Sequence, residues 1–132
     1  MSKFTLDIQA FVAKAKKNPE TVMRAVSLKL FSAIIKSSPV DTGRFRGNWQ
    51  TTGATPATGL VAGVDTTGNK AVNNASTYIG SAPNWYEFTL TNNLPYAERL
   101  EYGWSKQAPT GMIRVNIARF NTLLTEEAAK VK

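Results

Sequence analysis

Apolar positions near the amino terminus follow helical spacing. They recur at steps of three or four residues: Phe4, Ile8, Phe11, Val12 and Ala15. Asp7 suits the positive end of a helix dipole, and the lysines close to residue 17 suit its negative end. The spacing therefore predicts a first helix that begins at Thr5.

A second helix is predicted directly afterwards, with Asn18 as its N-cap and Pro19 as its first residue. Ser37, Ser38 and Pro39 should end it, because the residue before a proline is pushed out of the α region. Its apolar stripe is wide and predicts burial on two sides. The stripe comprises Val22, Met23, Val26, Leu28, Leu30, Phe31, Ile34 and Ile35.

The centre of the chain changes to strand and turn chemistry. Trp49 and Thr51 suggest a strand, and a second is expected at Leu60–Val64, where apolar residues alternate with small ones. Residues 53–76 are rich in Gly, Ala, Thr and Asn, which provide little side-chain volume for a core. We therefore expect a flexible loop at 66–76 that orders when it docks on a partner.

A clearer strand follows, because Tyr86, Phe88 and Leu90 alternate with polar residues before a turn at Asn92 and Asn93. A final helix should start near Thr110 or Gly111. Its apolar positions are Ile113, Ile117, Phe120, Leu124, Ala128 and Val131.

These elements predict an α+β fold in a single domain, residues 1–132. Two N-terminal helices and one C-terminal helix should pack against a small, mainly antiparallel sheet. The expected division is helical for 1–38 and β-rich for 39–95. A short turn or helix and then the C-terminal helix should fill 96–132.

Composition disfavours most catalytic chemistry. The chain has neither cysteine nor histidine, so thiolate metal sites, disulfides and the commonest general base are excluded. No signal peptide or long apolar run is evident, and we expect folding in a cytoplasm without a membrane role. The net charge of +7 suits either nucleic acid or an acidic protein partner.

Two weak catalytic patterns are better explained as structure. Gly63 and Gly68 have the spacing of a phosphate-binding loop, but Asn69 intrudes before Lys70, so a plain loop is favoured. Glu98 and Glu101 could share a helix face as an acid/base pair, yet the same spacing occurs in any exposed acidic turn.

Nucleic-acid binding has one specific argument. Arg44 and Arg46 flank Phe45, and Trp49 follows, which is how charge and stacking hold a single strand. The same two aromatic residues could instead seat the start of a strand on the helices, and no recognised nucleic-acid motif surrounds them.

Two stretches resemble a family of small neck and tail-joining proteins of tailed bacteriophages, the minor tail or tail-completion proteins. The first is SSPVDTGRFRGNW (37–49), a helix end that runs through Asp41 and Gly43 into a strand. The second is PYAERLEYGWSKQAPTGM (95–112), where a Tyr-Ala pair, a glutamate, a glycine and a proline precede the last helix. They occur in the order typical of the family.

The resemblance implies a structural virion protein without enzymatic activity or cofactor. It would form a homo-oligomeric ring, of six or twelve copies, in the neck or head-proximal tail after assembly in the host cytoplasm. Its partners would be head-connector and tail-tube or tail-terminator proteins, and DNA could pass through the lumen without specific recognition. A tail terminator and a basic DNA-binding accessory protein remain alternatives.

The candidate interface residues come from these two stretches and the last helix. Large aromatic residues with polar tips are favoured at interfaces. In a ring, an acidic segment of one copy could match arginines of its neighbour. The interface candidates are Asp41, Arg44, Arg46, Tyr96, Glu98, Glu101, Tyr102, Trp104 and Arg114. The expected structural turns are Pro39, Gly43, Pro95, Gly103 and Pro109.

Overall fold

The computed structural model describes residues 2–7, 19–40, 42–95, 97–102, 111–119, 122, 125–127 and 129. The main elements in chain order are β1 (Ser2–Asp7), α2 (Pro19–Ser37), α3 (Arg44–Gly47), β2 (Trp49–Thr52), α4 (Asn69–Ser81), β3 (Glu87–Asn92), α5 (Ala97–Glu101) and α6 (Ile113–Ile117). The mixed α+β class predicted from the sequence is confirmed.

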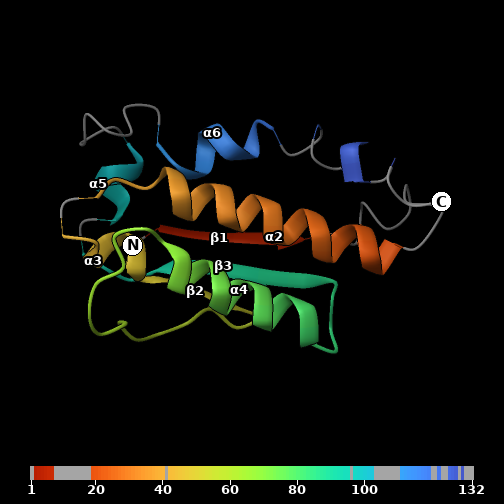
Figure 1. Ribbon diagram of the computed structural model, residues 1–132, viewed down its shortest axis with the longest axis horizontal. Helices are drawn as coiled ribbons and strands as arrows, with labels where there is room; N and C mark the ends of the chain where they lie inside the picture. The colour runs from red at the N-terminus through yellow and green to blue at the C-terminus, as the bar shows by residue number, and fades with distance from the viewer. Residues whose placement is uncertain are drawn as a thin grey trace.

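The three strands form one antiparallel sheet in the order β1-β3-β2 (Figure 1). β3 is the central strand, so Leu90 is paired with Phe4 on one side and with Thr51 on the other. Both faces of β3 are buried, although its sequence alternates: Thr89 and Thr91 are as inaccessible as Phe88 and Leu90. The Thr89 hydroxyl donates to the carbonyl of Gly53 at 2.7 Å, which satisfies its polarity inside the fold.

Helix α2 runs between α4 and α6 (Figure 1). The burial on two sides predicted from its wide stripe is therefore confirmed. Its buried side chains join those of β3 in the core, and the fully inaccessible large ones include Met23, Phe31 and Ile35 together with Phe88. No helix among the described residues is both long and apolar enough to cross a bilayer.

The end of α2 lies where the sequence predicts. Ser37 and Ser38 donate their hydroxyls to the carbonyl of Ile34, at 3.2 and 2.8 Å, and so satisfy a carbonyl in the last turn. The Ser38 hydroxyl also accepts the indole N–H of Trp49 at 2.7 Å. This contact fixes the start of β2 against the end of α2.

The first predicted helix is wrong over its opening residues, because Thr5 lies within β1. Residues 8–18 lie outside the described part of the chain. Helical spacing began at Phe4, but pairing with β3 from Ser2 to Asp7 gives these residues a full antiparallel ladder. Tertiary hydrogen bonding thus overrides the local pattern.

Two predictions for the centre are also wrong. Leu60–Val64 forms no strand, and Leu60 and Val64 are exposed. The predicted flexible loop at 66–76 is mostly helix, because α4 begins at Asn69. Ala71, Ala75 and Ile79 form its buried face, and the small size of the two alanines lets α4 pack closely on α2.

The later elements agree in part with their predictions. Strand β3 is confirmed, and α5 fits the expected short helix after it. Helix α6 starts where expected but ends at Ile117, with a turn at Ala118 and Arg119, so an unbroken helix from residue 113 is wrong. The 3₁₀-like bond from the Arg119 N–H to the Asn116 carbonyl tightens this end.

Candidate functional site

Two buried asparagines outside the stretches that carry the family resemblance bind to them: Asn92 to the first stretch, and Asn116 to both. The Asn92 side chain donates to the carbonyl of Phe45 at 2.9 Å and accepts the N–H of Leu94 at 3.2 Å. The Asn116 side chain donates to the Ser37 hydroxyl at 3.0 Å and to the Met112 carbonyl at 2.6 Å. Both are buried, and α3 and α5 accordingly lie at the same end of the molecule (Figure 1).

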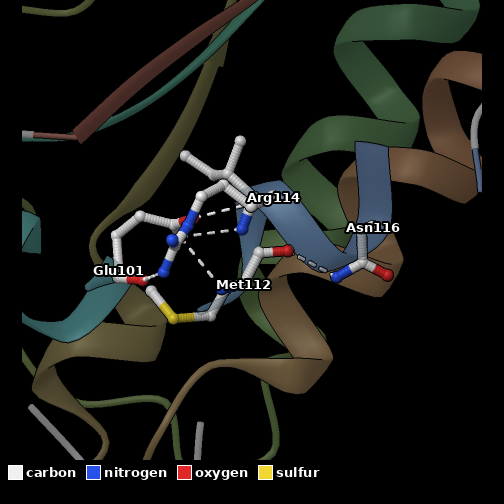
Figure 2. A network of polar contacts seen from close by, with 5 residues as sticks. Glu101, Met112, Arg114 and Asn116 are labelled. Atoms are coloured by element: carbon white, nitrogen blue, oxygen red, sulfur yellow. Dashed lines mark hydrogen bonds and ion pairs between the residues drawn. The ribbon is translucent and has the colours of Figure 1, made fainter. Parts of the chain in front are cut away.

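The Glu101 carboxylate joins α5 to the start of α6 (Figure 2). Its Oε1 accepts the N–H groups of Met112 and Ile113 at 2.9 and 2.8 Å, and its Oε2 accepts that of Arg114 at 2.9 Å. Glu101 is 6% exposed, so these charge-assisted bonds are formed largely away from water. Three amides that a new helix leaves without backbone partners are thereby satisfied.

Gly111 is required at this contact. Its φ is 84°, and a Cβ at this position would lie 2.4 Å from the Glu101 carbonyl oxygen and 2.7 Å from Oε2. Both the backbone conformation and the close approach of α5 therefore exclude a larger residue. We call the set Glu101, Gly111, Met112, Ile113 and Arg114 the α5–α6 clasp.

Arg114 completes the clasp and borders an exposed surface. Its Nε lies 3.1 Å from Glu101 Oε2, and its guanidinium also lies over the ring of Tyr102, 4.8 Å from the centroid. Tyr102 is 67% exposed. On α6, Val115 and Ile117 are also exposed, but they point to opposite sides of the helix, and Ile117 is the one that lies one turn along from Arg114. We call Tyr102, Arg114 and Ile117 the α6 surface.

A second carboxylate caps α4. Asp65 accepts the N–H of Gly68 through Oδ1 at 3.1 Å and the N–H of Ala71 through Oδ2 at 3.0 Å. The backbone N–H of Asp65 donates to the carbonyl of Gly43 at 2.9 Å, and Gly43 has a φ of 89°. The spacing of Gly63 and Gly68 resembles a phosphate-binding loop, yet Asp65 itself supplies the negative charge at this helix end.

Arg46 is an internal clamp. Its guanidinium donates to the carbonyls of Thr66, Lys36 and Ser38 at 2.9, 3.0 and 2.6 Å. Burial lowers the pKa of Arg46 from its ordinary value, and the negative charge of Asp65 acts in the opposite direction. These three hydrogen bonds join the end of α2 to the loop before α4.

The aromatic residues of the first stretch belong to the core. Phe45 and Trp49 are 6% and 2% exposed, and their rings meet edge to face with centroids 5.7 Å apart. They cannot stack on bases in this arrangement, which removes the specific argument for single-strand binding. Arg44 is exposed.

The predicted charge match between neighbouring copies needs correction for one pair. Glu101 and Arg114 were expected on opposite sides of a subunit interface, but they bind each other within one chain. The carboxylate is buried and shared among helix amides, so it has no free face for a neighbour. The prediction failed because α5 folds back on the start of α6, which no local pattern reveals.

The remaining candidates divide into described and undescribed positions. Pro39 is buried after α2, and Pro95 is exposed in the turn before α5. Glu98 lies within α5, although its side chain is outside the description. The candidates outside the described residues are Asp41, Tyr96, Gly103, Trp104 and Pro109.

Among the described residues, no group of three or more aspartate or glutamate side chains could hold a metal ion. Comparisons of the chain with family models, curated proteins and solved structures found no match.

Proposed function

We propose that this chain is a structural protein of a tailed-bacteriophage virion, which forms a ring in the neck and joins or completes the tail at the head-tail interface. The basis is the resemblance of residues 37–49 and 95–112 to the neck and tail-joining family. The ring, its partners and its place in the virion are part of the proposal.

One observation carries the proposal beyond the resemblance. β3 and most of β2 separate the two stretches in sequence, yet the buried Asn116 side chain donates to Ser37 of the first stretch and to Met112 of the second. A joining protein needs a rigid end to transmit contacts between neighbours, and a buried polar network supplies that rigidity.

The second stretch also has the properties expected of a joint. The α5–α6 clasp uses the Glu101 carboxylate for four hydrogen bonds inside the chain, which leaves it poorly suited to acid/base chemistry on a substrate. Next to the clasp, the α6 surface offers aromatic, aliphatic and arginine side chains to a neighbour.

The test is a phage in which the gene for this chain is inactivated. The expected lysate contains DNA-filled heads and tails that do not join, and supplying the chain in trans restores complete virions. Tails of abnormal length would instead identify the alternative, a tail terminator. Complete virions without the chain would contradict a role in the neck.

A solution measurement tests the ring. The mass of the purified chain is measured alone and with head-connector or tail-tube proteins, with and without DNA and at two salt concentrations. A discrete ring with a protein partner is expected. A complex with DNA alone that weakens steeply with salt would favour the DNA-binding accessory protein.

A further inference from the structure

We infer that copies of this chain meet head to tail, with the loop before α4 of one copy packed on a pair of aromatic rings beyond the other end of α4 in the next copy. The inference rests on the proposed function, because it names the surfaces through which neighbours in the ring would meet. We call residues 57–64 the amide-held loop, and Trp85 with Tyr86 the aromatic corner.

Side-chain amides fix the backbone of the amide-held loop. The Asn48 side chain donates to the carbonyl of Val61 at 3.2 Å and accepts its N–H at 2.8 Å. The Gln50 and Asn93 side chains both donate to the carbonyl of Gly59, at 2.7 and 3.0 Å. The backbone of the loop is therefore ordered by hydrogen bonds, without burial of all its side chains.

This arrangement leaves apolar side chains of the loop in solvent. Leu60 and Val64 are 54% and 62% exposed, and Ala62 and Gly63 between them are exposed as well. A segment that is ordered before binding loses little further conformational entropy when it docks. Burial of Leu60 and Val64 against a partner would therefore contribute directly to affinity.

The aromatic corner is also held in place and partly exposed. The rings of Trp85 and Tyr86 are stacked, with centroids 4.2 Å apart and an interplanar angle of 23°. Trp85 packs against the core, whereas Tyr86 is 40% exposed. The two rings thus form one aromatic surface of the kind that is enriched at protein interfaces.

The two surfaces lie at opposite ends of the molecule (Figure 1). Asp65, directly after the amide-held loop, donates its N–H to the carbonyl of Gly43, which lies between α2 and α3. At the other end of α4, the Arg24 guanidinium donates to the carbonyl of Ala82 at 2.8 Å, three residues before the corner. Between Arg24 and Ser37, α2 extends about 20 Å. A copy can therefore contact one neighbour through the loop and another through the corner, which is the heterologous arrangement from which rings are built.

The distribution of charge favours a second copy as the partner. Residues 47–86 contain only two charged side chains, Asp65 and Lys70, in a chain with 16 basic and 9 acidic residues and a net charge of +7. Asp65 is already engaged as the cap of α4. Copies that carry the same positive charge repel each other, so they associate best through surfaces without charge. The amide-held loop and the aromatic corner both belong to this stretch.

Self-association of the full chain is measured by sedimentation equilibrium at two salt concentrations. We expect association at chain concentrations below about 1 mM. It should persist or strengthen between about 0.05 and 0.5 M salt, because salt screens the repulsion between positively charged copies. A chain that stays monomeric at every concentration, or that dissociates as salt rises, would overturn the inference.

Variants locate the contact. The double change Leu60→Ser with Val64→Ser, and the single change Tyr86→Ser, should each weaken self-association at least about tenfold, because each removes apolar area from one of the two surfaces. Val115→Ser is the matched control, since it removes exposed apolar area on α6, and it should change the association by less than about twofold. Equal weakening by the control and by either test variant would contradict the assignment.

Mixing the two test variants distinguishes a head-to-tail contact from a contact of one surface with itself. The loop variant retains an intact aromatic corner, and the Tyr86→Ser variant retains an intact loop. An equimolar mixture should therefore form a 1:1 complex that neither variant forms alone, and its formation also shows that both variants are folded. If the mixture associates no better than the separate variants, the loop does not meet the corner.

Failure of this inference is separable from failure of the proposed function. Unjoined heads and tails in the absence of the gene, together with a chain that does not associate through these surfaces, refute only the head-to-tail contact. Self-association through the loop and the corner by a chain that virions do not need refutes only the neck role.

Discussion

Arg114 is bound to Glu101 through both its backbone and its side chain. The amide nitrogen and Nε of Arg114 lie 2.9 and 3.1 Å from the same carboxylate oxygen. A contact of this kind fixes the orientation of the first turn of α6 as well as its position. The α5–α6 clasp is therefore the place where a single substitution should disturb the second resemblance stretch most.

Replacing Glu101 tests the clasp directly. Glu101→Ala removes the acceptor of the buried amides of Met112 and Ile113, so we expect the free energy of unfolding to fall by about 3 kcal/mol. Glu101→Gln keeps one acceptor oxygen and should lose about 1–2 kcal/mol. Urea denaturation measures both. Exposed Glu126→Gln is the control, and a Glu101→Ala variant as stable as this control would refute the capping role.

Gly111→Ala should destabilise the protein through its backbone. The left-handed φ and the approach of the Glu101 carbonyl both oppose a Cβ, and we expect a loss of more than about 2 kcal/mol in thermal or urea unfolding. Gly59→Ala is the matched change, because a Cβ there meets nothing within 4 Å. It should stabilise by about 0.4–1 kcal/mol. Similar effects at the two positions would contradict the close packing of α5 on Gly111.

Arg46→Lys distinguishes an internal clamp from a surface charge. Lysine keeps the charge but cannot present the planar fork that reaches the carbonyls of Lys36, Ser38 and Thr66, so we expect a loss of about 1–3 kcal/mol. Exposed Arg44→Lys should change stability by less than about 0.5 kcal/mol. If the two variants unfold at the same urea concentration, Arg46 does not hold α2 and the loop together.

Asp65→Ala removes the cap of α4 and should cost about 1–2 kcal/mol of unfolding free energy. Asp65→Asn retains a side-chain acceptor and should recover part of this loss. Amide hydrogen exchange provides a local readout, since the N–H groups of Gly68 and Ala71 should exchange faster in the alanine variant. Unchanged protection at both amides would show that the cap is dispensable.

Helix α2 could be predicted because its signals are local. Pro19 opens it, Ser38 and Pro39 end it, and its apolar stripe is continuous between them. The start of α6 near Gly111 could be predicted for the same reason. Such signals act over one or two turns and need no knowledge of what packs against the helix.

The errors at α4 and at β1 have a common physical cause. The sequence of α4 is rich in Asn, Ser and Thr, which have weak helix propensity. Its stability comes from the Asp65 cap and from packing on α2, both of which are tertiary. Ala71, Ala75 and Ile79 do recur at four-residue steps, and this spacing was the available signal. For β1, the alternation of Phe4 and Leu6 with polar neighbours was the corresponding sign of a strand.

The candidate site was predicted in part. Glu101, Tyr102 and Arg114 were predicted as site residues, but Glu101 was expected to bind an arginine of a neighbouring copy. Only the fold brings its carboxylate next to the amides and the arginine of α6 in the same chain. Asn92 and Asn116 were not selected as site residues, since a polar residue gives no sign of burial until the chain around it is placed. Asp65 stands shortly before Gly68 and α4, and its capping could have been read from that position.

The place of β3 in the middle of the sheet also sets the order of events on the ribosome. β1 and β2 are both made before β3, and neither pairs with the other. During synthesis from the amino terminus, β1 and β2 therefore remain unpaired until Glu87–Asn92 has left the exit tunnel. Helix α2, with its local contacts, can form earlier, but the sheet closes in one late step that spans most of the chain.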